Sequence, residues 1–135
     1  TIMKCKHFVI QELVDRKTYE LRGEAALELL DNRLLEMIDK LREKFGKMTI
    51  NNWHWNGNRE WSGLRTPDSK YYSKYSQHSY GRAVDIIPAE IGVNEIRAYI
   101  KANPDEFPYI KGLEEDVTWL HIDCRNCDTL KSFKP

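Results

Sequence analysis

The chain's 135 residues suffice for one domain with a single hydrophobic core and are too few for two domains of ordinary size. Its 21 basic and 21 acidic residues cancel, so charge gives no support for nucleic acid or an anionic membrane as a partner. No apolar run approaches the roughly 20 residues that span a bilayer, and the N-terminus lacks the pattern of a secretory signal. This pattern would also be missing if a leader peptide had been removed before residue 1.

Three cysteines leave one without a partner and do not form a disulfide framework. Cys124 and Cys127 form a C-x-x-C, a spacing found in redox sites and in half of a zinc knuckle. The chain has no second C-x-x-C, and only Cys5 remains. We therefore expect reduced thiols.

Residues 27–45 carry the clearest helical pattern, after an opening segment (1–23) whose Phe8, Leu13 and Val14 are expected to pack against the domain. Apolar residues recur in it at spacings of three and four, which places them on one stripe of a helix. Gly46 follows where a C-terminal cap is expected. The predicted core residues are Leu27, Leu30, Leu34, Ile38, Leu41 and Phe45.

Residues 48–53 predict a strand, and a long loop follows from 54 to about 77. Loops of this length in small domains are usually functional or disordered, and a flexible linker would be poor in Trp and Tyr. This loop is rich in both. We interpret it as the wall of a substrate groove, with aromatic core packing as the alternative.

Alternation in residues 82–88 predicts a strand in which Ala83 and Asp85 share one face, opposite Val84 and Ile86. Gly81 permits a turn that brings His78 back over this strand.

A second helix is predicted at about 94–103, capped by Asn94 and stopped by Pro104. A loop at 104–113 leads to a final strand at about 117–124, which is followed by a tail that we expect to be irregular. One face of this strand would carry Val117, Trp119, His121 and Asp123.

His78, Asp85 and His121 are the candidate ligands of a metal ion. Imidazole and carboxylate suit a borderline cation such as zinc, and catalytic zinc usually takes three protein ligands and keeps one position open. A lone His in a strand is more often satisfied by its surroundings than a ligand. Together, the three residues lie on the polar faces of two strands that could be neighbours, and they predict a site for one Zn²⁺ ion.

Four segments resemble the zinc D-Ala-D-Ala carboxypeptidases and phage endolysin peptidases, a family that shares its fold with the Hedgehog signalling domain. Residues 76–85 (SQHSYGRAVD) are similar to the first signature of this family, and 119–123 (WLHID) to the second. Residues 62–67 (SGLRTP) resemble its upstream S-G-x-R segment, and Phe8 with 12–14 (ELV) its usual opening. The chain looks closest to the compact single-domain branch common in phage and prophage genomes.

The resemblance implies one α+β domain over residues 1–135, with an antiparallel sheet that carries the zinc site and packs against two to three helices. It implies that His78, Asp85 and His121 bind zinc and that Arg65 contacts substrate or the oxyanion. A surface salt bridge is the alternative role of Arg65.

The general base is the open part of this prediction. Several relatives place an acid three residues before the last His, but Thr118 stands there and cannot serve. Others place it six residues before, which is Glu115. Glu115 is our first candidate and Asp116 the second; the other acids nearby are Glu114 and Asp123.

Three further residues are expected to support the site. Asp123 is predicted to orient a ligand, as carboxylates beside metal-binding histidines do. Ser76 is predicted to fix the loop that carries His78, and Trp119 to form a wall beside His121.

By resemblance, the function is that of a zinc metallopeptidase acting on the peptidoglycan stem peptide in phage or prophage lysis. Both D,D-carboxypeptidase and L,D- or D,D-endopeptidase activity remain open. The alternative is a non-catalytic, zinc-stabilised module that binds the cell wall or a phage structure through its Trp/Tyr loop. A metal-dependent nuclease fits poorly, because the chain lacks a basic track for phosphates. We expect a monomer, made in the cytoplasm without a visible signal peptide, that reaches the wall after release or export.

Overall fold

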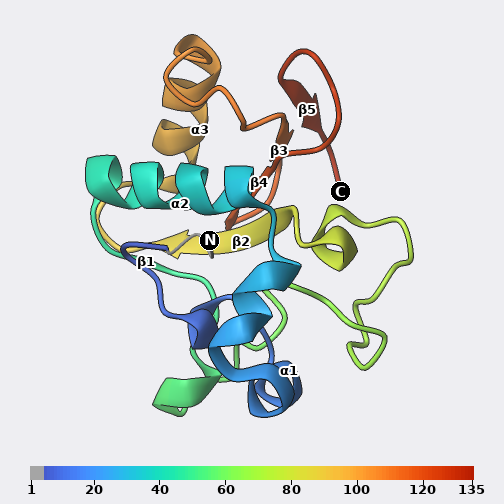
Figure 1. Cartoon of the computed structure of the whole chain (residues 1–135). Helices are drawn as coiled ribbons and strands as arrows, with labels where there is room; N and C mark the ends of the chain where they lie inside the picture. The colour runs from blue at the N-terminus through green and yellow to red at the C-terminus, as the bar shows by residue number, and fades with distance from the viewer. Residues whose placement is uncertain (1–4) are drawn as a thin grey trace.

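The computed structural model describes residues 5–135, which form a small α+β fold around a five-stranded sheet (Figure 1). The strand order is β1-β2-β4-β3-β5, and neighbours are antiparallel except for the parallel pair β3 and β5. The sheet is therefore mixed, and the prediction of an antiparallel sheet is wrong at its β5 edge. The strands are β1 (Met48–Thr49), β2 (Ala83–Pro88), β3 (Gly112–Glu114), β4 (Leu120–Asp123) and β5 (Lys131–Phe133).

The two central strands, β2 and β4, separate the hydrophobic core from a polar face. Their register places Asp85 opposite His121 and Ala83 opposite Asp123. Because side chains alternate along a strand, the intervening residues point the other way, into the core. The predicted alternation of β2 is thus confirmed, and its polar face meets the polar face of β4. The core residues of the two strands are Val84, Ile86, Leu120 and Ile122.

Three α-helices accompany the sheet: α1 (Arg16–Arg22), α2 (Asn32–Phe45) and α3 (Val93–Ala102). In Figure 1, α2 lies between α3 at the top and α1 at the bottom. The apolar stripe of α2 is buried in the same core as β2 and β4, as predicted for a scaffold helix. No helix among residues 5–135 is both long and apolar enough to cross a membrane.

The predicted helix at 27–45 is two elements. A 3-10 helix (Gly23–Leu29) comes first, and Leu30 then adopts an extended backbone. Asp31 caps α2 by accepting a hydrogen bond from the Arg33 N–H at 2.9 Å, and its own N–H donates to the Gly81 carbonyl oxygen. These two bonds set the start of α2 at Asn32, so the prediction began the helix too early.

The opening segment contains α1, which the sequence analysis did not predict. Asp15 begins this helix by accepting hydrogen bonds from the Thr18 N–H (3.1 Å) and hydroxyl (2.6 Å). Helix α3 begins at Val93 after Gly92, so Asn94 is not its cap. The side chain of Asn94 instead accepts a hydrogen bond from Arg97 at 2.6 Å.

Several predicted strands are shorter in the structure, and two were missed. The strand expected at 48–53 ends at Thr49, because the Asn51 N–H donates to Glu12 and a 3-10 turn begins at Trp53. The strand expected at 117–124 begins at Leu120, because the carbonyls of Val117 and Trp119 accept from Arg97. The region 104–113, expected to be a loop, leads into β3, and the tail, expected to be irregular, contains β5.

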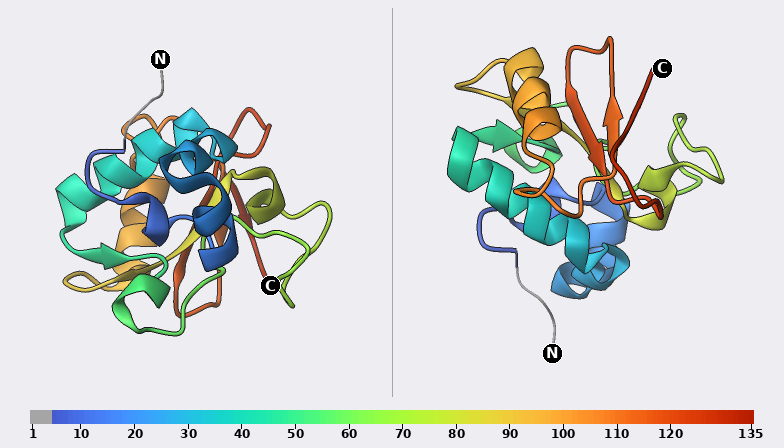
Figure 2. Two further views of the ribbon diagram at one scale, coloured as in Figure 1. Left: turned by 60° about the horizontal axis from the view of Figure 1, so that its bottom comes forward. Right: turned by 90° about the horizontal axis from the view of Figure 1, so that it is seen from above.

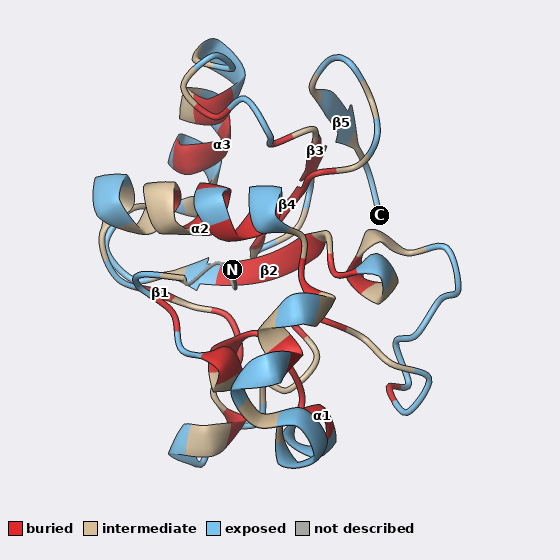
Figure 3. Cartoon of the chain, viewed as in Figure 1, coloured by how far each residue is buried: buried red, intermediate tan, exposed pale blue. Residues whose placement is uncertain are grey.

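The segment between β1 and β2 extends to one side of the sheet (Figure 2). It is largely exposed around residues 70–75, whereas β2, which follows it, is buried along most of its length (Figure 3). Its last turn, a 3-10 helix at Gln77–Tyr80, carries His78 to the start of β2. The fold thus brings one predicted ligand from this segment to two others on neighbouring strands.

Candidate metal site

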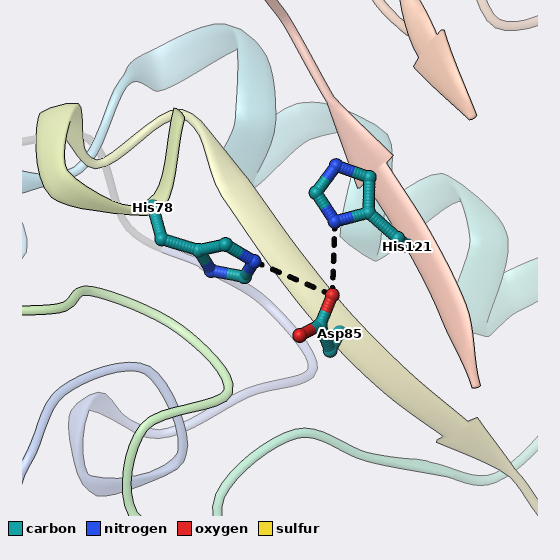
Figure 4. Close-up of side chains that lie close together, drawn as sticks. All are labelled: His78, Asp85 and His121. Carbon is teal, nitrogen blue, oxygen red and sulfur yellow. Dashed lines mark hydrogen bonds and ion pairs between the residues drawn. The ribbon is translucent and has the colours of Figure 1, made fainter. Parts of the chain in front are cut away.

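His78, Asp85 and His121 come together on the polar face of the sheet (Figure 4). One potential ligand atom from each lies within 4.8 Å of the other two, and all three residues are buried. Asp85 Oδ1 is 2.9 Å from Nδ1 of His121 and 3.3 Å from Nε2 of His78. This group could hold a metal ion.

His78 is oriented by the turn that carries it. Ser76 accepts a hydrogen bond from the His78 N–H at 3.2 Å, so the structure places Ser76 where it fixes this turn. Gly81 ends the turn with a φ of 69°, and a Cβ there would overlap the Leu29 carbonyl. Nδ1 of His78 lies 2.9 Å from the Gly63 carbonyl oxygen and must donate to it, which leaves Nε2 as the atom that faces Asp85.

His121 is oriented from its opposite edge. Its Nε2 lies 2.8 Å from Oδ2 of Asp123 and donates to it, so Nδ1 is the atom that faces Asp85. Two hydrogen bonds from Arg125, of 2.8 and 2.7 Å, hold the Asp123 carboxylate in place. The structure thus places Asp123 against the edge of His121 that faces away from Asp85.

Asp85 is held by its backbone and by Arg65. Its N–H donates to the Ser62 carbonyl oxygen at 2.7 Å, and its Oδ2 accepts from Nη2 of Arg65 at 3.0 Å. Nε of Arg65 donates to the Trp61 carbonyl oxygen at 2.8 Å. Arg65 is therefore fixed against a candidate ligand and is not a surface ion pair.

Electrostatics within the group follow from this close packing. Burial alone would lower the pKa of His121, but its hydrogen bonds to the carboxylates of Asp123 and Asp85 outweigh burial and raise the pKa to about 9. Burial would raise the pKa of Asp85, yet hydrogen bonds from His121 and His78 hold it well below its usual range. Asp85 is thus ionised at neutral pH, and a cation would compete with a proton on His121.

The donor set and its supports fit a divalent cation. Each imidazole presents one nitrogen to the shared space and has its other nitrogen on a carbonyl or carboxylate oxygen, the arrangement usual around metal-binding histidines. The third donor is an ionised carboxylate. The C-x-x-C is a poorer candidate, because burial, more than nearby charges, raises the pKa of the Cys124 thiol to about 12. Cys5, Cys124 and Cys127 form no disulfide.

The three residues line a cavity of about 740 Å³. The segment between β1 and β2 supplies much of its wall, including Trp61, Arg65, Tyr71 and Tyr75. Trp119 and Phe133 line it from the β4 and β5 side. Two buried polar atoms of this lining, Oε1 of Gln77 and Nε1 of Trp119, have no hydrogen-bond partner. The cavity therefore has both aromatic surface and free polar groups for a ligand.

The acidic run before β4 is divided between two sides of the sheet. Glu114 lines the cavity and follows Leu113, the last residue of β3 that pairs with β4, so it lies on the same face of β3 as Gly112, the partner of Asp123. Glu115 contacts Lys101 and lies 3.7 Å from Arg97, on the side of α3. Asp116 is exposed and pairs with Lys134 at 3.6 Å. The structure thus brings neither predicted base to the cavity.

Sequence reasoning gave less weight to Glu114 because it did not recognise β3. Leu113 is buried, so strand alternation around it would have pointed Glu114 away from the core. The sequence-based prediction also missed Phe133, whose ring centroid lies 5.4 Å from that of His121. No pattern in the short tail predicted that contact.

No family model, characterised protein or solved structure matches this chain. The fold and the site define a small α+β protein with a buried His-Asp-His group that could hold a metal ion.

Proposed function

We propose that the protein is a zinc metallopeptidase that hydrolyses an amide bond in the stem peptide of bacterial peptidoglycan. The observation that carries this proposal is the convergence of His78, Asp85 and His121 at the wall of a cavity. Two imidazoles and one carboxylate form a ligand set of the kind that catalytic zinc uses. The fold of the D-Ala-D-Ala carboxypeptidases, and action on the wall after release or export, are part of the same proposal.

Zinc held by these residues would supply a Lewis acid and an activated water at the cavity wall. Glu114 is the acid best placed to take the proton of that water and return it to the leaving amine. It lines the same cavity as His121, whereas its neighbours Glu115 and Asp116 do not line the cavity and are paired with lysines.

Arg65 would stabilise the negative charge that develops on the carbonyl oxygen of the cleaved bond. Its guanidinium lines the cavity and is fixed by Trp61 and Asp85, so it needs no reorganisation during the reaction. The choice of peptidoglycan as substrate is supported by the two signature-like segments, and the aromatic cavity wall is compatible with a peptide ligand.

The test is digestion of purified peptidoglycan, followed by mass spectrometry of the products and measurement of new amino groups. We expect cleavage by the zinc-loaded protein, loss of cleavage with a chelator, and recovery when zinc is returned. His121→Ala should be inactive, whereas His7→Ala, at a histidine paired with Glu43 outside the cavity, should be active. The mass of the products would identify the bond.

A second candidate is a non-catalytic module that binds the wall. The observation in its favour is a group of exposed tyrosines between β1 and β2, of which Tyr71 and Tyr75 line the cavity: Tyr71, Tyr72, Tyr75 and Tyr80. Binding of peptidoglycan by the zinc-loaded protein without release of amino groups would support this module and contradict the peptidase.

A further inference from the structure

Arg59 is a cation on the cavity wall that the proposed reaction does not use. Its backbone is held by Asn52: the Arg59 N–H donates to Oδ1 of Asn52 at 2.9 Å, and the Asn52 N–H donates to the Arg59 carbonyl oxygen at 2.9 Å. Its side chain is also fixed, because Nε donates to the Ile50 carbonyl oxygen (3.1 Å) and Nη2 to the Ser62 hydroxyl (2.9 Å). The guanidinium therefore has a defined position.

Arg59 differs from the other arginines of the cavity in its charge balance. Arg65 is paired with Asp85, and Arg125 with Asp123. The partners of Arg59 are a carbonyl and a hydroxyl, and no carboxylate within residues 5–135 lies within ion-pair distance of it. The adjacent Glu60 also lines the cavity, but its Oε2 accepts from the Arg16 N–H at the start of α1 (3.0 Å), and it forms no ion pair with Arg59. Arg59 thus presents an uncompensated, half-buried positive charge to the cavity.

The position of Arg59 relative to the metal site is defined by Ser62. The hydroxyl of Ser62 accepts from Arg59, and its carbonyl oxygen accepts from the Asp85 N–H at 2.7 Å. One residue therefore joins the guanidinium to a candidate zinc ligand. Arg59 and the candidate zinc ligands also line the same cavity.

We propose that Arg59 forms an anion subsite that binds a free carboxylate of the peptide substrate close to the cleaved bond. This inference rests on the proposed function and specifies its substrate class as an anionic peptide. Nη1 of Arg59 forms no hydrogen bond with residues 5–135, so it can donate to a carboxylate together with the second N–H of Nη2. Guanidinium and carboxylate match in such a paired geometry, and charge-assisted bonds of this kind are the strong ones.

Two carboxylates of a stem peptide could occupy this subsite. One is the α-carboxylate of a γ-linked glutamate within the peptide, and the other is the C-terminal carboxylate. Four synthetic peptides separate these sources: both groups as acids, either one as a primary amide, and both as amides. Each amide keeps the size of the acid but removes its charge.

The experiment measures kcat/KM for the four peptides with the zinc-loaded parent, Arg59→Gln and Arg59→Lys. For the parent, amidation of one carboxylate should lower kcat/KM about 10- to 100-fold, mainly through KM. Arg59→Gln should lose the same factor on the acid peptide and nothing on the corresponding amide, with Arg59→Lys between the two. The sensitive position identifies which carboxylate is bound. Arg22→Gln, the same change at an exposed residue of α1, should behave as the parent.

Equal rates on all four peptides would overturn the subsite, although the peptidase would stand. An equal loss by Arg59→Gln on acid and amide peptides would also overturn it, because Arg59 would then only hold its loop. If no peptide is cleaved, the proposed function fails, and the dissociation constants of the same peptides, from tryptophan fluorescence, test the subsite alone. They should show the same dependence on carboxylate and on Arg59; no such dependence would overturn it.

Discussion

The carboxylate of Asp123 occupies the space that a side chain at Gly112 would need. The two residues face each other across β3 and β4, and a Cβ on Gly112 would overlap both carboxylate oxygens of Asp123. That carboxylate is the group that orients His121, at 2.8 Å from Nε2. Because Gly112 has no side chain, Asp123 can occupy this space and orient His121, the candidate zinc ligand two residues before it on β4.

Gly112→Ala is expected to weaken zinc binding, because the added methyl group would displace Asp123 from His121. Asp123→Asn should also weaken zinc binding, because it removes the negative charge next to the His121 imidazole. Loss of such a supporting contact typically costs 10- to 100-fold in metal affinity. Competition with a chelator of known affinity measures this effect. Asp116→Asn, the same chemical change at an exposed residue, should leave the affinity unchanged, and equal losses at 116 and 123 would contradict the role of Asp123.

Glu114→Gln should abolish amide hydrolysis while zinc remains bound, because Gln cannot accept the proton of the attacking water. Removal of a general base typically costs about 10²- to 10⁴-fold in rate. Glu115→Gln is the matched control, one residue away and directed toward Lys101 and Arg97. It should keep its rate and lose at most about 1 kcal/mol of stability, as expected for a partly exposed ion pair. Full activity of Glu114→Gln would show that Glu114 is not the general base.

The sequence predicted the parts of the site that depend on regular alternation. Asp85 and His121 alternate with core residues in their strands, so their meeting followed once β2 and β4 paired. The places of Glu114 and Phe133 could not be predicted in this way. Their strands, β3 and β5, have three residues each, and the alternation in so short a segment is not recognisable. Their positions depend on pairing between distant segments, which periodicity does not report.

A contact between distant segments also explains why the helix predicted at 27–45 began too early. Its leucine spacing continues past Asp31, but the cap and the hydrogen bond from Asp31 to Gly81 divide it into a 3-10 turn and α2. That bond joins residues far apart in the chain. Local spacing could not predict it.

Zinc should stabilise the folded protein through the His-Asp-His group. At a free concentration 100 times the dissociation constant, binding to the native state alone adds about 2.7 kcal/mol to the free energy of unfolding. Thermal unfolding with and without zinc measures this gain. His121→Ala should lose it, whereas His7→Ala should keep it, since His7 lies at the surface beside Glu43. An equal gain in parent and His121→Ala would mean that zinc binds elsewhere, for example at Cys127.

Arg97→Met should destabilise the fold and disturb the site together. Arg97 is only 4% exposed, and its guanidinium donates to the carbonyls of Val117 (3.1 Å) and Trp119 (3.1 Å). These bonds shape the connection that leads from β3 to His121. Methionine would replace the aliphatic part of the Arg97 side chain and leave the two carbonyls without hydrogen-bond partners. The free energy of unfolding, measured with denaturant, should fall by about 2–4 kcal/mol. Lys101→Met is the control, because it removes the other, more exposed cation beside Glu115. It should lower the free energy of unfolding by less than about 1 kcal/mol. Equal losses of stability in the two variants would show that the hydrogen bonds from Arg97 to the carbonyls contribute nothing.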